Sequence, residues 1–223
     1  KAADADLRAV IDPSLDQLTL IHDSGKVLDD TQSLFCFLEL LSGTIQGESV
    51  ALPVNAPKAA STLLESRGAK VHSTKTSAPA LMAEADSAGV VFAANMEGGV
   101  ILPGFMSAFD ASAGLLKMLD LLASGGSSLS EVVASVPQAH LVHETVVTPW
   151  EQKGLVMRSL VEQTQGRDVE LIDGVKVNHD SGWALLLPDP EEPVTHIWTE
   201  GESAQAAKQL SQEYARRLRQ MVR

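Results

Sequence analysis

The side chains best suited to nucleophilic or metal chemistry are one cysteine and six histidines. Cys36 stands inside the apolar run 34–38. A reactive thiolate needs a cationic neighbour, and none is close in the sequence, so we expect a buried structural thiol. A single cysteine also excludes a disulfide framework and a cysteine-based zinc site. The histidines show no metal-ligand spacing: His22, His72, His140, His143, His179 and His196.

The charge balance limits the kinds of partner. The 223 residues carry a formal net charge of −12, and 44% of them are hydrophobic, which is a globular composition. An acidic chain does not hold nucleic acid by neutralising phosphates, and it does not bind an anionic membrane surface. No apolar run approaches a membrane span, and Lys1–Asp6 lacks a signal-peptide pattern. We therefore expect a cytoplasmic protein with no nucleic-acid partner and no membrane partner.

The first stretch of the chain is predicted to form two short strands and a helix. The predicted elements are strand 7–11, turn 12–16, strand 18–21, hairpin turn 23–26 and helix 31–41. A block of about forty residues is too small to be a domain of its own. We therefore expect residues 1–46 to be the end of a domain.

Residues 47–142 alternate between strand and helix patterns. The predicted strands are 49–52, 70–73 and 90–93, and the predicted helices are 58–67, 78–86, 110–123 and 130–136. Such alternation with short loops favours a mostly parallel sheet covered by helices.

The last block changes to a run of strands closed by a long helix. The predicted strands are 140–147, 169–172, 175–178, 183–187 and 194–199, and the predicted helices are 151–163 and 203–221. This order indicates an α+β module. We expect Trp150, Trp183 and Trp198 to anchor its core.

Several short motifs together resemble one known family. They are 98–103 with Asp110, 148–154 with 156–158, 173–177, 182–183 and 192–193. In this order they resemble the second half of the phosphohexomutase superfamily (phosphoglucomutase/phosphomannomutase). The last block is most similar to mutase-like regions fused behind a nucleotidyltransferase of the mannose-1-phosphate guanylyltransferase type.

The resemblance implies an α/β fold with three parts. Residues 1–46 would be the end of mutase domain 2, residues 47–142 would be domain 3, and residues 143–223 would be domain 4. The domains of this family are α/β, with a mixed sheet covered by helices, and the last is an α+β domain. The serine that carries phosphate in the family belongs to domain 1, and no serine here matches its motif.

The family binds magnesium in a loop of pattern Asp-x-Asp-x-Asp-Arg, whose alternate carboxylates turn toward one hard cation. The matching stretch here is 12–17. It keeps Asp12 and Asp16, but Ser14 replaces the middle carboxylate and Gln17 replaces the arginine. The resemblance thus implies a weak, vestigial magnesium site at Asp12, Ser14 and Asp16. We favour the alternative, a turn whose aspartates accept hydrogen bonds from nearby backbone N–H groups.

The family's sugar-binding loop has a glutamate that accepts hydrogen bonds from sugar hydroxyls. Asn95 occupies its position here, Glu97 lies two residues on, and Gly98 and Gly99 follow. An asparagine can still bond a hydroxyl. The resemblance therefore implies a vestigial sugar site, and the alternative is a loop kept for its glycine turn.

The family's phosphate loop has the pattern Arg-Pro-Ser-Asn/Gly-Thr-Glu-Pro, which clasps the substrate's phosphate. The corresponding residues here are Leu187, Pro188, Asp189, Pro190, Glu191, Glu192 and Pro193. The arginine is lost, carboxylates replace the hydroxyls, and Pro190 lacks an N–H donor. We expect this vestigial loop to repel phosphate.

The sequence therefore predicts a degenerate phosphohexomutase-like module, structural or regulatory, in a sugar-phosphate or sugar-nucleotide enzyme. It would pack against upstream nucleotidyltransferase or mutase domains of the same polypeptide, or bind a hexose phosphate or sugar nucleotide. The alternative is a fragment of an active phosphomannomutase or phosphoglucomutase that uses Asp12, Asp16, Asn95 and Glu97 with magnesium. A third hypothesis is an oligomerisation module.

Overall fold

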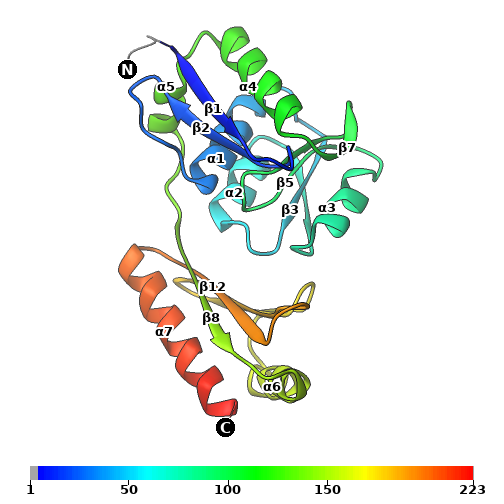
Figure 1. Ribbon diagram of the computed structural model, residues 1–223, viewed down its shortest axis with the longest axis vertical. Helices are drawn as coiled ribbons and strands as arrows, with labels where there is room; N and C mark the ends of the chain where they lie inside the picture. Colours follow the sequence, from blue (N-terminus) through cyan, green and yellow to red (C-terminus); the bar gives the residue numbers. More distant parts are fainter. Residues whose placement is uncertain (1–4, 223) are drawn as a thin grey trace. The chain divides into compact units, whose positions relative to one another are not determined.

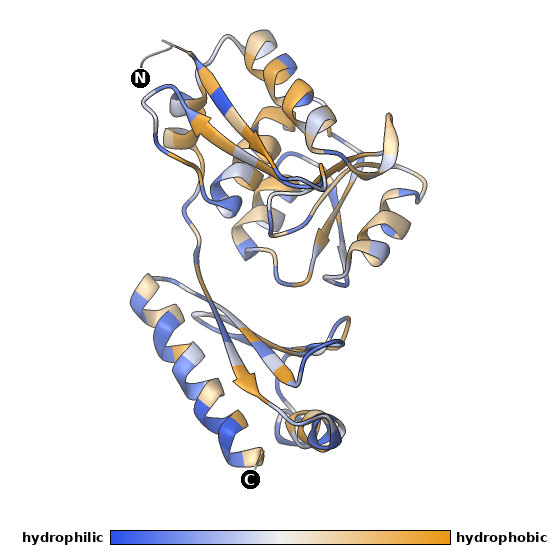
Figure 2. Cartoon of the chain, viewed as in Figure 1, coloured by the Kyte–Doolittle hydropathy of each residue, from blue (hydrophilic) through white to orange (hydrophobic). Residues whose placement is uncertain are grey.

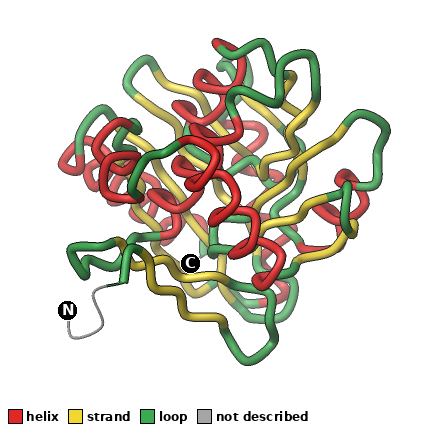
Figure 3. The backbone as a smooth tube through the Cα atoms, turned by 90° about the horizontal axis from the view of Figure 1, so that it is seen from above, coloured by secondary structure: helices red, strands yellow, loops and turns green. Residues whose placement is uncertain are grey.

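The computed structural model describes residues 5–222. The chain forms two compact units, Lys1–Gln138 and Ala139–Arg223 (Figure 1). The boundary predicted between residues 46 and 47 stays a prediction, because residues on both sides of it belong to the first unit. Loops and turns join the helices and strands (Figure 3).

The first unit contains a five-stranded sheet in the order β4-β3-β5-β6-β7. Its strands are β3 (Ser49–Pro53), β4 (Lys70–Thr74), β5 (Val90–Ala94), β6 (Val100–Leu102) and β7 (Met106–Phe109). The three longer strands pair in parallel, whereas β6 and β7 pair antiparallel. The sheet is therefore mixed.

Helices cover both faces of this sheet. The helices of this unit are α1 (Asp30–Leu41), α2 (Lys58–Ser66), α3 (Ala78–Ala85), α4 (Ala111–Gly125) and α5 (Leu129–Ser135), of which α5 packs against α1. On one face, Leu81 of α3 packs with Ala51 and Ala93, which are register partners in β3 and β5. On the other face, the Phe37 ring of α1 lies 5.8 Å from the Phe92 ring of β5. Phe92 and Ala93 face opposite sides of the sheet because successive side chains of a strand point to opposite faces.

A separate antiparallel hairpin precedes these elements. Its strands are β1 (Leu7–Ile11) and β2 (Leu18–His22), and α4 packs against both (Figure 1). Figure 2 shows that hydrophobic residues concentrate in α1 and α4 and in the strands that they cover. Cys36 is fully buried in α1, and burial raises the pKa of its thiol to about 12. The expectation of a buried thiol is confirmed.

The second unit is an antiparallel sheet with two helices on one face. Its elements are β8 (His140–Val147), α6 (Trp150–Gln163), β9 (Val169–Glu170), β10 (Val175–His179), β11 (Gly182–Pro188), β12 (Val194–Gly201) and α7 (Ala204–Met221). The strand order is β8-β12-β11-β10-β9. Residues of α6 and α7 such as Val156 and Tyr214 form one core with Leu186 and Ile197 of the sheet. The expected fold class, an α/β unit followed by an α+β unit, is confirmed.

The opposite face of the second sheet carries aromatic and histidine side chains. Residues on β12 alternate, so that His196 and Trp198 face away from the buried Ile197. Trp183 is only 2% exposed, but Trp150 at the start of α6 is 51% exposed. The prediction that all three tryptophans anchor the core is therefore wrong for Trp150, and also for Trp198, which lies on the face opposite the core. No helix among residues 5–222 is long and apolar enough to cross a membrane.

Candidate functional site

The loop between β1 and β2 is closed by one of its own carboxylates. Asp12 accepts hydrogen bonds from the backbone N–H groups of Ser14 at 3.0 Å, Asp16 at 2.9 Å and Gln17 at 2.7 Å. The Ser14 hydroxyl also donates to Asp12. Leu15 adopts a left-handed conformation with φ of 66° in this tight turn. Both carboxylate oxygens of Asp12 are therefore used inside the loop.

These contacts determine how well the loop suits magnesium. The Ser14 hydroxyl, followed by the backbone donors, lowers the pKa of Asp12 to about 2. Magnesium requires oxygens that converge on one point, whereas the oxygens of Asp12 turn toward the N–H groups of their own loop. Among residues 5–222, no group of three histidine, cysteine, aspartate or glutamate side chains is arranged to hold a metal ion. The loop as folded does not fit magnesium, and binding at Asp12, Ser14 and Asp16 stays a prediction.

The loop between β5 and β6 is also closed by its own side chain. Asn95 Oδ1 accepts from the N–H of Gly99 at 2.7 Å and from the N–H of Glu97 at 3.0 Å. Gly98 has φ of +82°, which favours glycine, and a Cβ there would lie 3.0 Å from the Leu18 carbonyl oxygen. The acceptor of Asn95 that could bind a sugar hydroxyl is thus already bonded.

The two loops lie side by side. The Leu18 N–H, directly after the first loop, donates to the Gly98 carbonyl at 3.1 Å. The surroundings are acidic: burial first, and then Asp29 and Glu97, raise the pKa of Asp30. The fold therefore brings together the predicted metal and sugar loops, and surrounds them with negative charge.

The predicted phosphate loop joins β11 to β12 in the second unit. Asp189 Oδ1 accepts from the N–H groups of Glu191 at 2.7 Å and Glu192 at 2.6 Å. Asp189 Oδ2 lies 2.8 Å from His196 Nε2. The hydrogen bond from His196, followed by the two backbone donors, lowers the pKa of Asp189 to about 2. The loop thus holds an ionised carboxylate among its own donors.

Two residues to which the sequence assigned no role in this loop support it. Lys153 of α6 donates to the carbonyl oxygens of Asp189 and Glu192. The same ammonium lies 3.6 Å from the centroid of the Trp150 ring. His196 in turn bonds His143, with 2.9 Å between Nδ1 and Nε2. The spacing of Lys153 and His196 along the sequence gave no signal, because their roles depend on strand register and on the position of α6.

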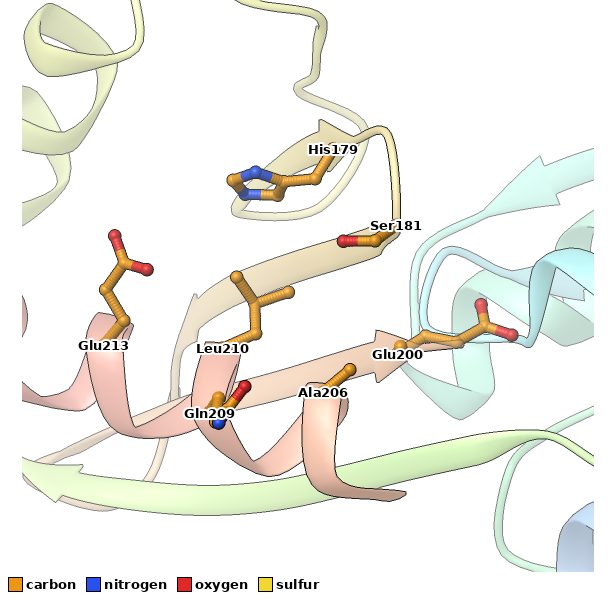
Figure 4. Close-up of a pocket in the computed structure, with 8 residues that line it drawn as sticks. His179, Ser181, Glu200, Ala206, Gln209, Leu210 and Glu213 are labelled. Atoms are coloured by element: carbon orange, nitrogen blue, oxygen red, sulfur yellow. The ribbon is translucent and has the colours of Figure 1, made fainter. Parts of the chain in front are cut away.

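A pocket of about 210 Å³ lies on the helix-covered side of the second sheet (Figure 4). Its lining includes His179, Ser181, Glu200, Gln209, Leu210 and Glu213. Leu210 points into the space beside His179 and Ser181, whereas the Glu200 side chain points away from it (Figure 4). The His179 ring bonds Tyr214 at 3.0 Å. None of the residues predicted to bind magnesium, sugar or phosphate lines this pocket.

Comparison with known proteins bears on the family of the chain. Residues 30–140 match the family model described as phosphoglucomutase/phosphomannomutase, alpha/beta/alpha domain III. A Methanopyrus kandleri protein named "Probable phosphoglucosamine mutase" is 31% identical over 226 residues, which cover 100% of this chain and 50% of that protein. The chain belongs to the phosphohexomutase superfamily. The 95–99 loop of this phosphohexomutase-like chain lies inside the matched family model, and the 12–17 and 187–193 loops lie outside it.

Other proteins of the superfamily are similar to this chain over most of its length. A phosphoglucomutase/phosphomannomutase of Thermococcus kodakarensis is 22% identical over 214 residues, covering 94% of this chain and 46% of that protein. The crystal structure of a phosphoglucomutase/phosphomannomutase family protein from Burkholderia thailandensis has a TM-score of 0.83 and 21% identity, covering 99% of this chain and 48% of that one. This likeness confirms the fold. The chain spans about half the length of the curated relatives that it matches.

Proposed function

We propose that this chain is a phosphohexomutase-like module without mutase chemistry, which serves a structural or regulatory role in a sugar-phosphate or sugar-nucleotide enzyme. The observation that carries the proposal is the β11–β12 loop. The Asp189 carboxylate binds the N–H groups of Glu191 and Glu192, which are the donors that a bound phosphoryl group would need. Leu187 supplies no guanidinium in place of the family's arginine, and Pro190 has no N–H.

The negative charge of the β11–β12 loop also disfavours phosphate binding. Asp189, Glu191 and Glu192 place three carboxyl groups in one short loop, and both glutamates are exposed. Because the pKa of Asp189 is held at about 2, this carboxylate is ionised at neutral pH. A phosphate monoester carries roughly −1.5 to −2 charges at that pH. Like charges repel, so the loop disfavours the anion that its counterpart in the family would bind.

The first unit supports the same proposal. Asp12 uses both carboxylate oxygens within its own turn, and Asn95 uses its side-chain oxygen within its own loop. Magnesium and sugar hydroxyls would have to displace these internal hydrogen bonds. In all three loops, therefore, the side chain at the family's ligand position closes the loop instead.

A rival function is the second half of a working mutase that uses Asp12, Asp16, Asn95 and Glu97 with magnesium. The 31% identity to a protein named as a phosphoglucosamine mutase favours it. In either case we infer that the chain acts together with upstream domains of one polypeptide, of the mutase type or of the mannose-1-phosphate guanylyltransferase type. A hexose phosphate or a sugar nucleotide would be the substrate or effector.

Turnover by the longest native polypeptide that contains this chain separates the two functions. It is supplied with magnesium and either mannose 6-phosphate or glucosamine 6-phosphate, and formation of the 1-phosphate is followed by phosphorus NMR. We expect no conversion. Magnesium-dependent formation of either 1-phosphate would establish the rival function. A variant in which residues 187–193 are replaced by Arg-Pro-Ser-Gly-Thr-Glu-Pro serves as the matched comparison for hexose-phosphate binding.

A further inference from the structure

Two side chains and two backbone N–H groups donate hydrogen bonds to oxygens of Asp189 and Glu192 in the β11–β12 loop. The N–H groups of Glu191 and Glu192 bind one oxygen of Asp189, and His196 Nε2 lies 2.8 Å from the other. The Lys153 ammonium donates to the carbonyl oxygens of Asp189 and Glu192. These are two adjacent backbone donors, an imidazole and an ammonium.

The three donors that reach the Asp189 carboxylate, two backbone N–H groups and an imidazole, are of the kind that binds an oxyanion. Successive backbone N–H groups in a turn form a concave anion site, and charge-assisted bonds from lysine or histidine strengthen it. The Asp189 carboxylate meets the same requirements as a small external anion, since it offers two oxygens and one negative charge. The chain itself therefore supplies the anion that the site binds.

We propose that residues 189–196 form an oxyanion site whose resident anion is the Asp189 carboxylate, while Lys153 holds the backbone carbonyls of the same loop. The site binds inorganic phosphate or a phosphate monoester only when that carboxylate is removed. This inference rests on the proposed function, because it assigns the loss of phosphate binding to occupation from within as well as to repulsion. The contact is an autoinhibitory one built into a single loop.

His196 is held in the orientation that the site needs. Because the ionised Asp189 can only accept, the proton of a neutral His196 lies on Nε2, and its Nδ1 accepts from His143 Nε2 at 2.9 Å. Both imidazole rings stack on the Trp198 indole, with centroid distances of 4.3 Å for His143 and 4.8 Å for His196. The position of the His196 ring is therefore held by this stacking and does not depend on Asp189.

The test compares phosphate binding by the wild-type chain, Asp189→Ala and Asp189→Asn. The Asp189→Asn substitution removes the same charge but keeps an oxygen that can accept from the two backbone donors. Amide NMR spectra are recorded during titration with inorganic phosphate. We expect saturable shifts of the Glu191 and Glu192 amides only in Asp189→Ala, with affinity at least about tenfold above that of the other two proteins. Equal affinity in Asp189→Ala and Asp189→Asn would overturn the proposal, because charge alone would then explain the gain.

A measurement on the wild-type chain covers the case in which Asp189→Ala does not fold. Through-hydrogen-bond coupling between the Glu191 and Glu192 amide nitrogens and the Asp189 carboxyl carbon reports the contact directly. We expect both couplings, and the absence of both would refute the occupied site. Phosphate binding by the wild type at these amides would instead refute the proposed function. A folded Asp189→Ala that binds no phosphate would refute this inference and leave the proposed function standing.

Discussion

Replacing Asn95 with alanine removes the acceptor that closes the loop between β5 and β6. Asn95 Oδ1 accepts from a partly buried N–H of Gly99 at 2.7 Å and from an exposed N–H of Glu97 at 3.0 Å. Water can replace the lost partner of the exposed N–H, so that bond contributes little. A partly buried donor left without a partner costs about 1–3 kcal/mol. We therefore expect Asn95→Ala to lower the free energy of unfolding by about 1–2 kcal/mol.

Urea unfolding followed by far-UV circular dichroism measures this loss. Asn178→Ala is the matched control, because Asn178 donates from its side chain to the Glu170 carboxylate at 3.0 Å and closes no loop. This bond is part-buried, but its loss leaves no backbone donor without a partner, so a smaller cost of about 0.5–1 kcal/mol is expected for Asn178→Ala. If Asn95→Ala were no more destabilising than Asn178→Ala, the Asn95 oxygen would be free for a ligand, and the account of a self-closed sugar loop would be wrong.

The remaining predictions concern α4 and the second unit. A Cβ at Gly114 of α4 would lie 2.6 Å from Val100 Cγ2, so Gly114→Ala should cost about 1–3 kcal/mol in urea unfolding. Gly125, in the last turn of the same helix, has no atom within 4 Å of a built Cβ, so Gly125→Ala should instead stabilise by about 0.5–1 kcal/mol; equal effects of the two would contradict the packing. Burial lowers the pKa of His143 and His179, so below about pH 6.5 the unfolded chain binds more protons than the folded chain. The free energy of unfolding should therefore decrease as the pH is lowered from 7.5 to 5.5. The decrease should be smaller in the His143→Gln, His179→Gln double variant. An increase in stability on acidification would contradict this reasoning.

Periodicity alone located most of the elements. The strand and helix patterns of residues 47–142 correspond to β3, α2, β4, α3, β5 and α4. The β6–β7 hairpin was missed because its strands, Val100–Leu102 and Met106–Phe109, are only 3 and 4 residues long. Strands of that length contain too few residues to show a two-residue alternation.

The replacement of the family's ligand residues in the three loops is evident from the sequence, but the hydrogen bonds inside these loops could not be predicted from it. The sequence alone predicts that the carboxylates of the phosphate loop repel a phosphate group. That Asp189 turns inward depends on backbone geometry around Pro190, and its bond to His196 depends on how the loop meets β12. His143 on β8 is the register partner of Trp198 on β12, although the two residues are 55 positions apart (198 − 143). This register places the His143 ring beside the ring of His196, which lies on the same face of β12 as Trp198. Register between such distant strands is set by packing and is not written in local sequence.

The measurement that tests the central claim most directly is an amide NMR titration of this chain with glucosamine 6-phosphate in the presence of magnesium. If the β11–β12 loop is closed by Asp189, the Glu191 and Glu192 amide resonances keep their positions throughout the titration. Saturable movement of both resonances would show a phosphoryl group bound in the loop, and would contradict the loss of phosphate recognition on which the account depends.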